Sequence, residues 1–132
     1  MSQDFITAYI ACALWSSTDN SRENGGDPLD DNYSVEDVDE ETVALMRKDC
    51  ETFLRLAGEA IERATHKTAH KHGGKYDMAG HDFWLNRNRH GCGFWDGDWD
   101  EPWATTLDAL AESFGEFDLY VGDDGKVYGH KS

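Results

Sequence analysis

The strongest structural constraint in this 132-residue sequence is the helical spacing of apolar side chains over residues 39–64. Apolar residues that recur every three or four positions lie on one face of an amphipathic helix. Here they are Val43, Met46, Cys50, Phe53, Leu54, Ala57 and Ile61. Asp39 is the predicted N-cap, and Glu40 and Glu41 occupy the first turn, where the helix dipole favours negative charge. We therefore expect a long helix over residues 39–64 that packs one face on a core, slightly weakened by Gly58.

Two more helices and a hairpin are predicted towards the ends of the chain. Residues 2–15 place apolar side chains on a wide helical face, and residues 101–114 combine Pro102 in the first turn with Gly115 after the last turn. Residues 117–121 and 126–130 alternate as strands on either side of Asp123-Asp124-Gly125, a strong hairpin turn.

The central segment, residues 80–101, is predicted to form a second hairpin. Apolar and polar residues alternate over 81–87, residues 87–91 have turn composition, and residues 92–95 return as a strand. This hairpin would carry a cationic tip of Arg87, Arg89 and His90. The predicted order is α-α-β-β-α-β-β in one domain, residues 1–132. The predicted fold class is α+β, with helices packed on one face of a small, mainly antiparallel four-stranded sheet.

The formal net charge of −15 limits the classes of partner. Such a field repels nucleic acid and anionic membranes and favours basic proteins, including those that normally hold DNA or RNA. An alternative explanation is that acidity only keeps the protein in solution. Three widely spaced cysteines without a CxxC pair predict reduced thiols in a cytosol, and the N-terminus lacks the basic residue of a signal peptide. We expect an intracellular protein that does not enter a membrane and does not bind nucleic acid directly.

Two acidic stretches are the predicted partner-binding surfaces. An acidic loop covers about residues 16–38, and residues 27–41 carry eight carboxylates and no basic residue. Dense like charges remain in solvent, where they form either a plain solvated face or an anionic surface that imitates spaced phosphates. Aromatic side chains such as Trp84, Trp95 and Trp103 would supply anchors. The candidate contact residues are Asp27, Asp30, Asp31, Glu36, Asp37, Arg87, Arg89, Asp96, Asp98, Trp99 and Asp100.

Metal binding has weak support in the sequence, and no cofactor is predicted. A His- and Lys-rich connector over about residues 65–78 contains His66, His70 and His72, which would suit zinc or nickel but lack an accompanying ligand. The spacing of Asp96, Asp98 and Asp100 matches that of the first ligands in a calcium-binding loop. An EF-hand then requires Gly and a later Glu where this chain has Glu101 and Leu107.

An enzyme is the alternative prediction. The central segment contains residue types that small hydrolases and nucleases use for catalysis: His81, Asp82, His90 and Asp96, with Asn88. The sequence contains no HExxH, P-loop or nucleophile elbow. Single-strand binding by the tip is disfavoured by the net charge, and the sequence does not determine the oligomeric state.

Residues 79–96 (AGHDFWLNRNRHGCGFWD) resemble a family of small uncharacterised bacteriophage and prophage proteins. The resemblance extends to DLYVGDDGKVY at residues 118–128 and to YIACALWSS and DDNYSVEDV near the N-terminus. Members have Gly or Ala where this chain has Arg89 and Cys92, and Thr where it has Asn86. The resemblance implies a phage protein in the cytoplasm of an infected bacterium. It also implies an inhibitor of a host nucleic-acid-handling or defence enzyme, and it supplies no catalytic residues.

Overall fold

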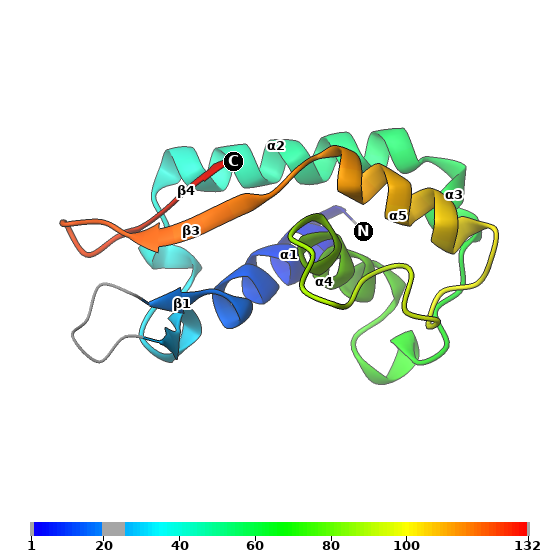
Figure 1. The fold of residues 1–132 in the computed structure, drawn as a ribbon, viewed down its shortest axis with the longest axis horizontal. Coiled ribbons are helices and arrows are strands. Elements are labelled where there is room, and N and C mark those ends of the chain that lie inside the picture. Colours follow the sequence, from blue (N-terminus) through cyan, green and yellow to red (C-terminus); the bar gives the residue numbers. More distant parts are fainter. Residues whose placement is uncertain (1, 20–25, 132) are drawn as a thin grey trace.

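The computed structural model describes residues 2–19 and 26–131, which form a mixed fold of helices and short strands (Figure 1). The helices are α1 (Ser2–Ser16), α2 (Glu40–Ala57), α3 (Glu59–Arg63), α4 (Lys75–Arg87) and α5 (Trp103–Ser113). Short 3-10 turns are η1 (Leu29–Asp31), η2 (Val35–Asp37) and η3 (Ala69–Lys71). The strands are β1 (Thr18–Asp19), β2 (Asp27–Pro28), β3 (Phe117–Val121) and β4 (Val127–Lys131). The predicted α+β class is confirmed; residues 20–25 of the predicted acidic loop lie outside the described residues.

The helices and the terminal hairpin with strong local signals form where they were predicted. The Asp39 side chain caps α2 by accepting a hydrogen bond from the Thr42 N–H at 3.3 Å. Gly58, with φ of 45°, divides the predicted 39–64 helix into α2 and α3. The predicted helices at 2–15 and 101–114 correspond to α1 and α5, and the predicted C-terminal hairpin corresponds to β3 and β4.

The strands pair as two separate antiparallel ribbons. β1 pairs with β2, and β3 pairs with β4 in a register that sets Leu119 opposite Gly129. An isolated parallel bridge between Val38 and Val127 joins the segment before α2 to β4. The prediction of one four-stranded sheet is therefore wrong for the described part of the chain.

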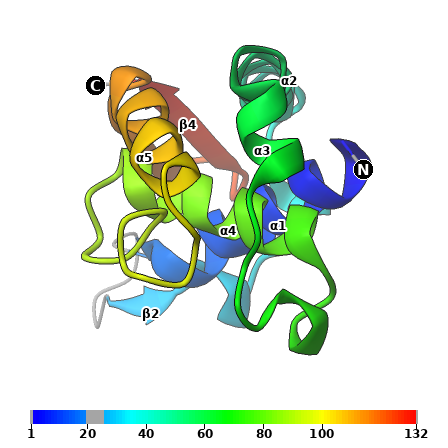
Figure 2. The same ribbon diagram turned by 90° about the vertical axis from the view of Figure 1, so that its right-hand side faces the viewer.

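The error arises in the central segment, where residues 81–87 belong to α4 instead of a strand, and residues 92–95 continue as a loop. Residues 75–78 of the predicted connector also belong to α4. All six residues from Asp82 to Arg87 are buried, because α1, α5 and the following loop surround this end of α4. Figure 2 shows α4 between these elements. Full burial on every side removes the apolar–polar period that distinguishes a helix from a strand. A helix pairs its own backbone groups, so this segment is buried without a neighbouring strand.

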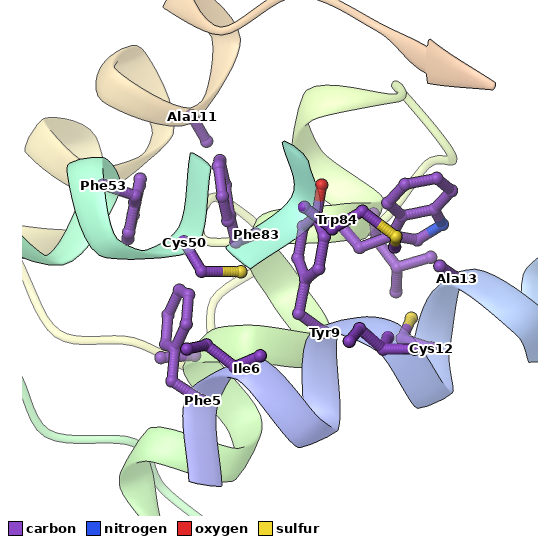
Figure 3. Packing of buried hydrophobic residues seen from close by; sticks show 14 of the residues in the cluster. Phe5, Ile6, Tyr9, Cys12, Ala13, Cys50, Phe53, Phe83, Trp84 and Ala111 are labelled. Carbon is purple, nitrogen blue, oxygen red and sulfur yellow. The ribbon is translucent and has the colours of Figure 1, made fainter. Parts of the chain in front are cut away.

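The core lies where α1 and α4 pack against α2 and α5. Phe5 and Tyr9 of α1 face Phe53 of α2 and Phe83 of α4 (Figure 3). The rings of Phe53 and Phe83 stack with centroids 4.2 Å apart, and those of Phe5 and Phe53 are 5.6 Å apart. Buried aromatic rings contribute strongly to core stability, and these four join three helices. Among the described residues, no helix has both the length and the apolar character that crossing a membrane requires.

Gly80 permits the close approach of α4 to α1. A Cβ atom at this position would lie 2.1 Å from the Phe5 carbonyl oxygen and 3.1 Å from the Tyr9 backbone nitrogen. Both atoms belong to the α1 backbone, so side-chain rotation does not relieve the clash.

We predict that Gly80→Ala destabilises the protein by about 2 kcal/mol, because the two helices must separate. An exposed helical Gly→Ala change would instead stabilise by about 1 kcal/mol. Urea unfolding followed by circular dichroism measures the effect. Gly91→Ala is the control for backbone strain, because Gly91 has φ of 80° and an added Cβ there meets nothing within 4 Å. A Gly80→Ala variant at least as stable as the wild type would contradict the assigned packing.

Candidate functional site

The start of α2 and the β3–β4 turn lie at the same end of the molecule (Figure 1), and the carboxylates around them are mostly exposed, with Asp37 partly buried. The Val38–Val127 bridge and a 2.8 Å hydrogen bond from the Asp39 N–H to the Val127 carbonyl hold these two segments together. Within residues 2–19 and 26–131, no ion pair joins this group to a basic side chain. We call the group the acidic end: Asp27, Asp30, Asp31, Glu36, Asp37, Glu40, Glu41, Asp123 and Asp124.

The second acidic stretch, residues 96–100, lies away from the acidic end and packs against residues 65–67 (Figure 1). The Lys67 N–H donates to the Asp98 carbonyl at 3.0 Å, and the Thr65 N–H donates to the Asp100 carboxylate. Asp100 thus holds the loop to the chain that follows α3, whereas Asp96 and Asp98 remain exposed. The predicted contact residues are therefore divided between two separate surfaces.

Trp99 is buried, which contradicts its predicted role as an exposed contact. Its side chain is 3% exposed and packs edge-on against the His66 ring, with centroids 5.0 Å apart. Its Nε1–H donates a hydrogen bond to Asp82 Oδ2 at 2.7 Å. Trp84 is also buried, whereas Trp95 is exposed. The tryptophan with the largest exposed fraction among the described residues is Trp15, at 56%, which lies in the predicted 2–15 helix and was not among the predicted contacts.

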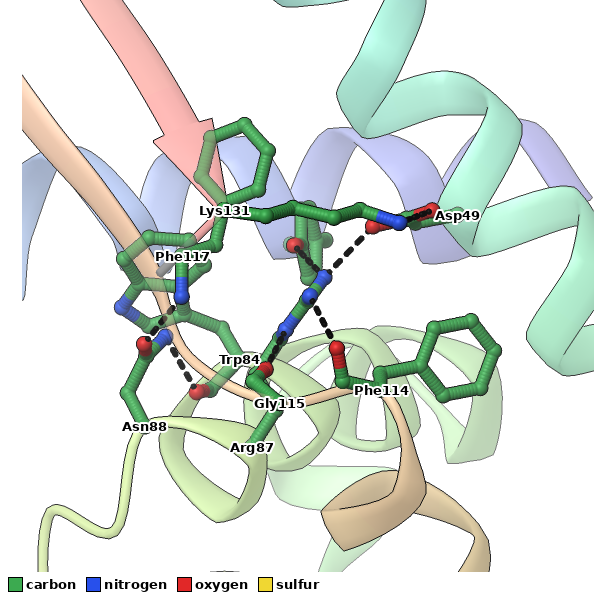
Figure 4. A network of polar contacts seen from close by, with 9 residues as sticks. Asp49, Trp84, Arg87, Asn88, Phe114, Gly115, Phe117 and Lys131 are labelled. Carbon is green, nitrogen blue, oxygen red and sulfur yellow. Dashed lines mark hydrogen bonds and ion pairs between the residues drawn. The ribbon is translucent and has the colours of Figure 1, made fainter.

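Arg87 is buried rather than exposed at a cationic tip. The side chain points from the end of α4 into the protein, where it is 1% exposed (Figure 4). Nη1 donates to Asp49 Oδ2 at 2.8 Å and to the Tyr9 hydroxyl at 3.0 Å. Nε and Nη2 donate to the carbonyls of Gly115 and Phe114 at 2.8 and 3.1 Å. Of the predicted tip, Arg89 and His90 are exposed and Arg87 is a structural residue.

The buried charge of Arg87 is balanced within the protein. Lys131 adds a second cation 3.0 Å from Asp49 Oδ1, and three aromatic rings lie within 5.4–5.6 Å of the Arg87 guanidinium. Burial raises the pKa of Tyr9 far above its ordinary value, against the opposing charge of Arg87. The hydroxyl therefore stays protonated and accepts from Arg87.

His81 and Asp82 are the two predicted catalytic residues that the structure brings together. His81 Nδ1 lies 3.6 Å from Asp82 Oδ1, which is too long for a hydrogen bond. Burial raises the pKa of Asp82 to about 7, and the hydrogen bond from Trp99 partly opposes this shift. Burial lowers the pKa of His81, with further lowering from His66 and His72. Adjacent titratable groups with shifted pKa values occur at acid–base catalytic sites and also in structural networks.

The other predicted catalytic residues do not join this pair. His90 and Asp96 are exposed beyond the end of α4, and no hydrogen bond or ion pair in the described chain links either to His81. Asn88 instead accepts from the Phe117 N–H at 2.8 Å and supports β3.

The histidines of the 65–78 connector do not form a metal centre. His66 is buried beside Trp99, whereas His70 and His72 are exposed. Over residues 2–19 and 26–131, no three His, Cys, Asp or Glu side chains gather in a way that would hold a metal ion. Asp96, Asp98 and Asp100 do not form such a group either.

Two surface hollows lie along α1. The first, of about 690 Å³, contains His81, His72, Asp77, Asp30, Trp15 and Cys12 in its lining. The second, of about 470 Å³, is lined mainly by apolar side chains of α1, η2 and α2. Ala11 and Asp30 line both hollows. Burial raises the pKa of Cys12 to about 12, so its thiol is protonated and a poor nucleophile.

Comparison with known proteins adds no assignment. No family model, curated protein or solved structure matches this chain.

We predict that Arg87→Met destabilises the fold by about 3 kcal/mol, because Asp49 is left buried with only Lys131 as a charged partner. The double variant Arg87→Met, Asp49→Leu recovers part of this loss, since it removes both buried charges. Urea unfolding measures both variants. Exposed Arg89→Met is the control, with an expected change within about 0.5 kcal/mol; equal effects at the two arginines would contradict the burial of Arg87.

We predict that the wild-type protein becomes less stable as the pH rises towards 7, because buried Asp82 loses its proton. Its pKa in the folded protein, about 7, lies above the ordinary value of 3.8. The folded state therefore binds the additional proton between these values, and the associated stability is lost as the pH rises towards 7. Asp82→Asn, whose amide oxygen still accepts from Trp99, should gain about 2 kcal/mol relative to wild type between pH 5 and pH 8. Parallel pH–stability curves for the two proteins would show that Asp82 has an ordinary pKa.

Proposed function

We propose that this chain is a small phage-encoded interaction protein that inhibits a nucleic-acid-handling or defence protein of its bacterial host. In this proposal it presents an anionic surface, like that of DNA, to the basic groove of its target. The observation that carries the proposal is the acidic end, where three stretches of sequence bring carboxylates together, most of them exposed and none in an ion pair with a basic side chain among the described residues.

The arrangement suits electrostatic recognition of a basic protein. Surface carboxylates outside ion pairs generate a negative potential that extends about 8 Å at physiological ionic strength and accelerates encounter with a positive patch. Protein folding does not require such a concentration of like charge, because self-repulsion opposes the compact state. Contact with a basic groove would relieve this repulsion.

The same features disfavour direct binding of nucleic acid. The guanidinium of Arg87, expected at the surface, is occupied inside the protein by Asp49. Arg89 remains as the exposed arginine of the predicted tip, in a chain with a net charge of −15. Phosphate binding depends on several cations acting together, which this surface does not supply.

A second candidate function is acid–base catalysis at the first hollow. The 3.6 Å separation of His81 and Asp82 and the position of His81 in the hollow favour it. The lack of a third predicted catalytic residue beside them disfavours it. Hydrolysis of generic phosphodiester and ester substrates by wild type, lost in His81→Gln, would establish this function; unchanged turnover in that variant would exclude it.

We predict that neutralising four carboxylates of the acidic end weakens capture of the target at least tenfold. The variant carries Asp31→Asn, Glu36→Gln, Glu40→Gln and Glu41→Gln. The matched control removes the same charge from exposed positions elsewhere, through Glu51→Gln, Glu62→Gln, Glu112→Gln and Glu116→Gln. Tagged proteins are incubated with bacterial lysate at low salt, washed with increasing salt, and the retained proteins are identified by mass spectrometry.

Wild type and control should retain one common DNA- or RNA-binding protein, while the acidic-end variant retains at least tenfold less. With the purified target, duplex DNA should compete, and affinity should fall about tenfold or more between 50 and 300 mM salt. Equal retention by the two four-site variants, or affinity that is independent of salt, would contradict the proposal.

A further inference from the structure

The outward side of α1 places two small residues, Ala8 and Ala11, at the edge of the hollows, and Asp4, Thr7 and Trp15 are also exposed on this helix. Phe5 and Tyr9 point into the core (Figure 3), whereas Ala8 is half-buried. Ala11, two residues after Tyr9 and so on the opposite side of the helix, is exposed. Ala11 lines both hollows, and Ala8 lines the first. Small side chains at such a position allow another polypeptide backbone to approach the helix closely. The structure thus presents two hollows that a single segment could occupy while crossing α1.

The second hollow is suited to apolar side chains. On α1 its lining includes Ile6, Ile10 and Leu14, which are only 2–4% exposed, and the other side includes Tyr33, Val35 and Val43. Asp30 and Arg47 add one charge of each sign to the lining. Val35 is 48% exposed, although it is a large apolar residue on a short 3-10 turn. Burial by a partner of the apolar surface that remains accessible here, chiefly that of Val35, would contribute hydrophobic stabilisation to the complex.

The first hollow is suited to a cation. Trp15, 56% exposed, lies beside the His81 ring with centroids 5.9 Å apart. The carboxylates of Asp30 and Asp77 belong to the same lining. A tryptophan face and two carboxylates together attract an ammonium or guanidinium group. Because burial lowers the pKa of His81, its ring is neutral near pH 7 and does not oppose such a cation.

We propose that this face of α1 docks a basic amphipathic segment of the partner protein. Its apolar side chains enter the second hollow, its backbone crosses at Ala11, and a lysine or arginine side chain enters the first hollow beside Trp15, Asp30 and Asp77. Apolar complementarity on one side of α1 and charge complementarity on the other favour this occupant. The inference rests on the proposed function, since it specifies how the same basic partner is held, and it adds an anchoring site separate from most of the acidic end.

The probe for this site is a fluorescein-labelled 14-residue peptide of leucine and lysine, with the leucines at helical spacing. A scrambled peptide of identical composition and charge lacks an apolar face and serves as its control. Fluorescence anisotropy in 150 mM salt measures both affinities. We expect the amphipathic peptide to bind at least tenfold more tightly than the scrambled peptide, because charge alone is equal in the two.

Ala11→Arg blocks the crossing point and lies on an exposed helical position, so it leaves the core packing unchanged. Ala109→Arg adds the same charge at an exposed position of α5, outside both hollows, and is the matched control. We expect Ala11→Arg to weaken binding of the amphipathic peptide at least tenfold, and Ala109→Arg to change it less than twofold. Unfolding curves of both variants establish that they are folded.

Equal weakening by the two arginine substitutions, or equal binding of the two peptides, would overturn the proposal. A dimer of the wild type that Ala11→Arg abolishes, without peptide binding, would assign this face to a second copy of the chain and also overturn it. The proposed function is tested separately. If Ala11→Arg retains the lysate target that the acidic-end variant loses, the acidic surface acts without the α1 face, and only the docking inference fails.

Discussion

The fold depends on the burial of one cation, Arg87, inside a strongly acidic protein. A buried guanidinium is tolerated only where its charge and its hydrogen-bond donors are satisfied. Asp49 supplies the charge, and Tyr9 and two backbone carbonyls after α5 supply further acceptors. These partners come from α1, α2 and the segment that leads into β3, so the guanidinium fixes three parts of the chain around the end of α4. Lys131 extends the same network to β4.

The position of α4 in turn defines the two sides of α1. Gly80 lets the two helix backbones approach, and the aromatic side chains of α1 then fill the space towards α2. The side left outside carries Ala8 and Ala11 at the edge of the two hollows, and Asp4 as its charged residue. Close internal packing and an accessible outer face are therefore consequences of the same helix pair. This is the structural basis for proposing that a partner segment crosses α1.

The distribution of charge also follows from the tertiary structure. Residues 27–41 and the β3–β4 turn, distant in sequence, are joined by the Val38–Val127 bridge and together expose carboxylates at one end. The other acidic loop, residues 96–100, is used partly for structure, because Asp100 binds the Thr65 backbone and Trp99 is buried against His66. Net charge by itself indicates the sign of a partner surface. The location of the binding surface depends on which carboxylates are exposed and outside ion pairs, and tertiary structure decides this.

The sequence by itself determined the elements whose signals are local. The amphipathic period and the Asp39 cap specified α2, the apolar face specified α1, and Asp123-Asp124-Gly125 specified the β3–β4 hairpin. Tertiary structure alone decided the identity of α4, because a segment buried on every side has no polar face to reveal its period. It also decided the place of Arg87, which sequence pattern assigns to the surface unless its partner, Asp49, is known to lie beside it. The physical reason is that burying a charge depends on contacts between residues far apart in the chain, whereas helix and turn formation depend on neighbours.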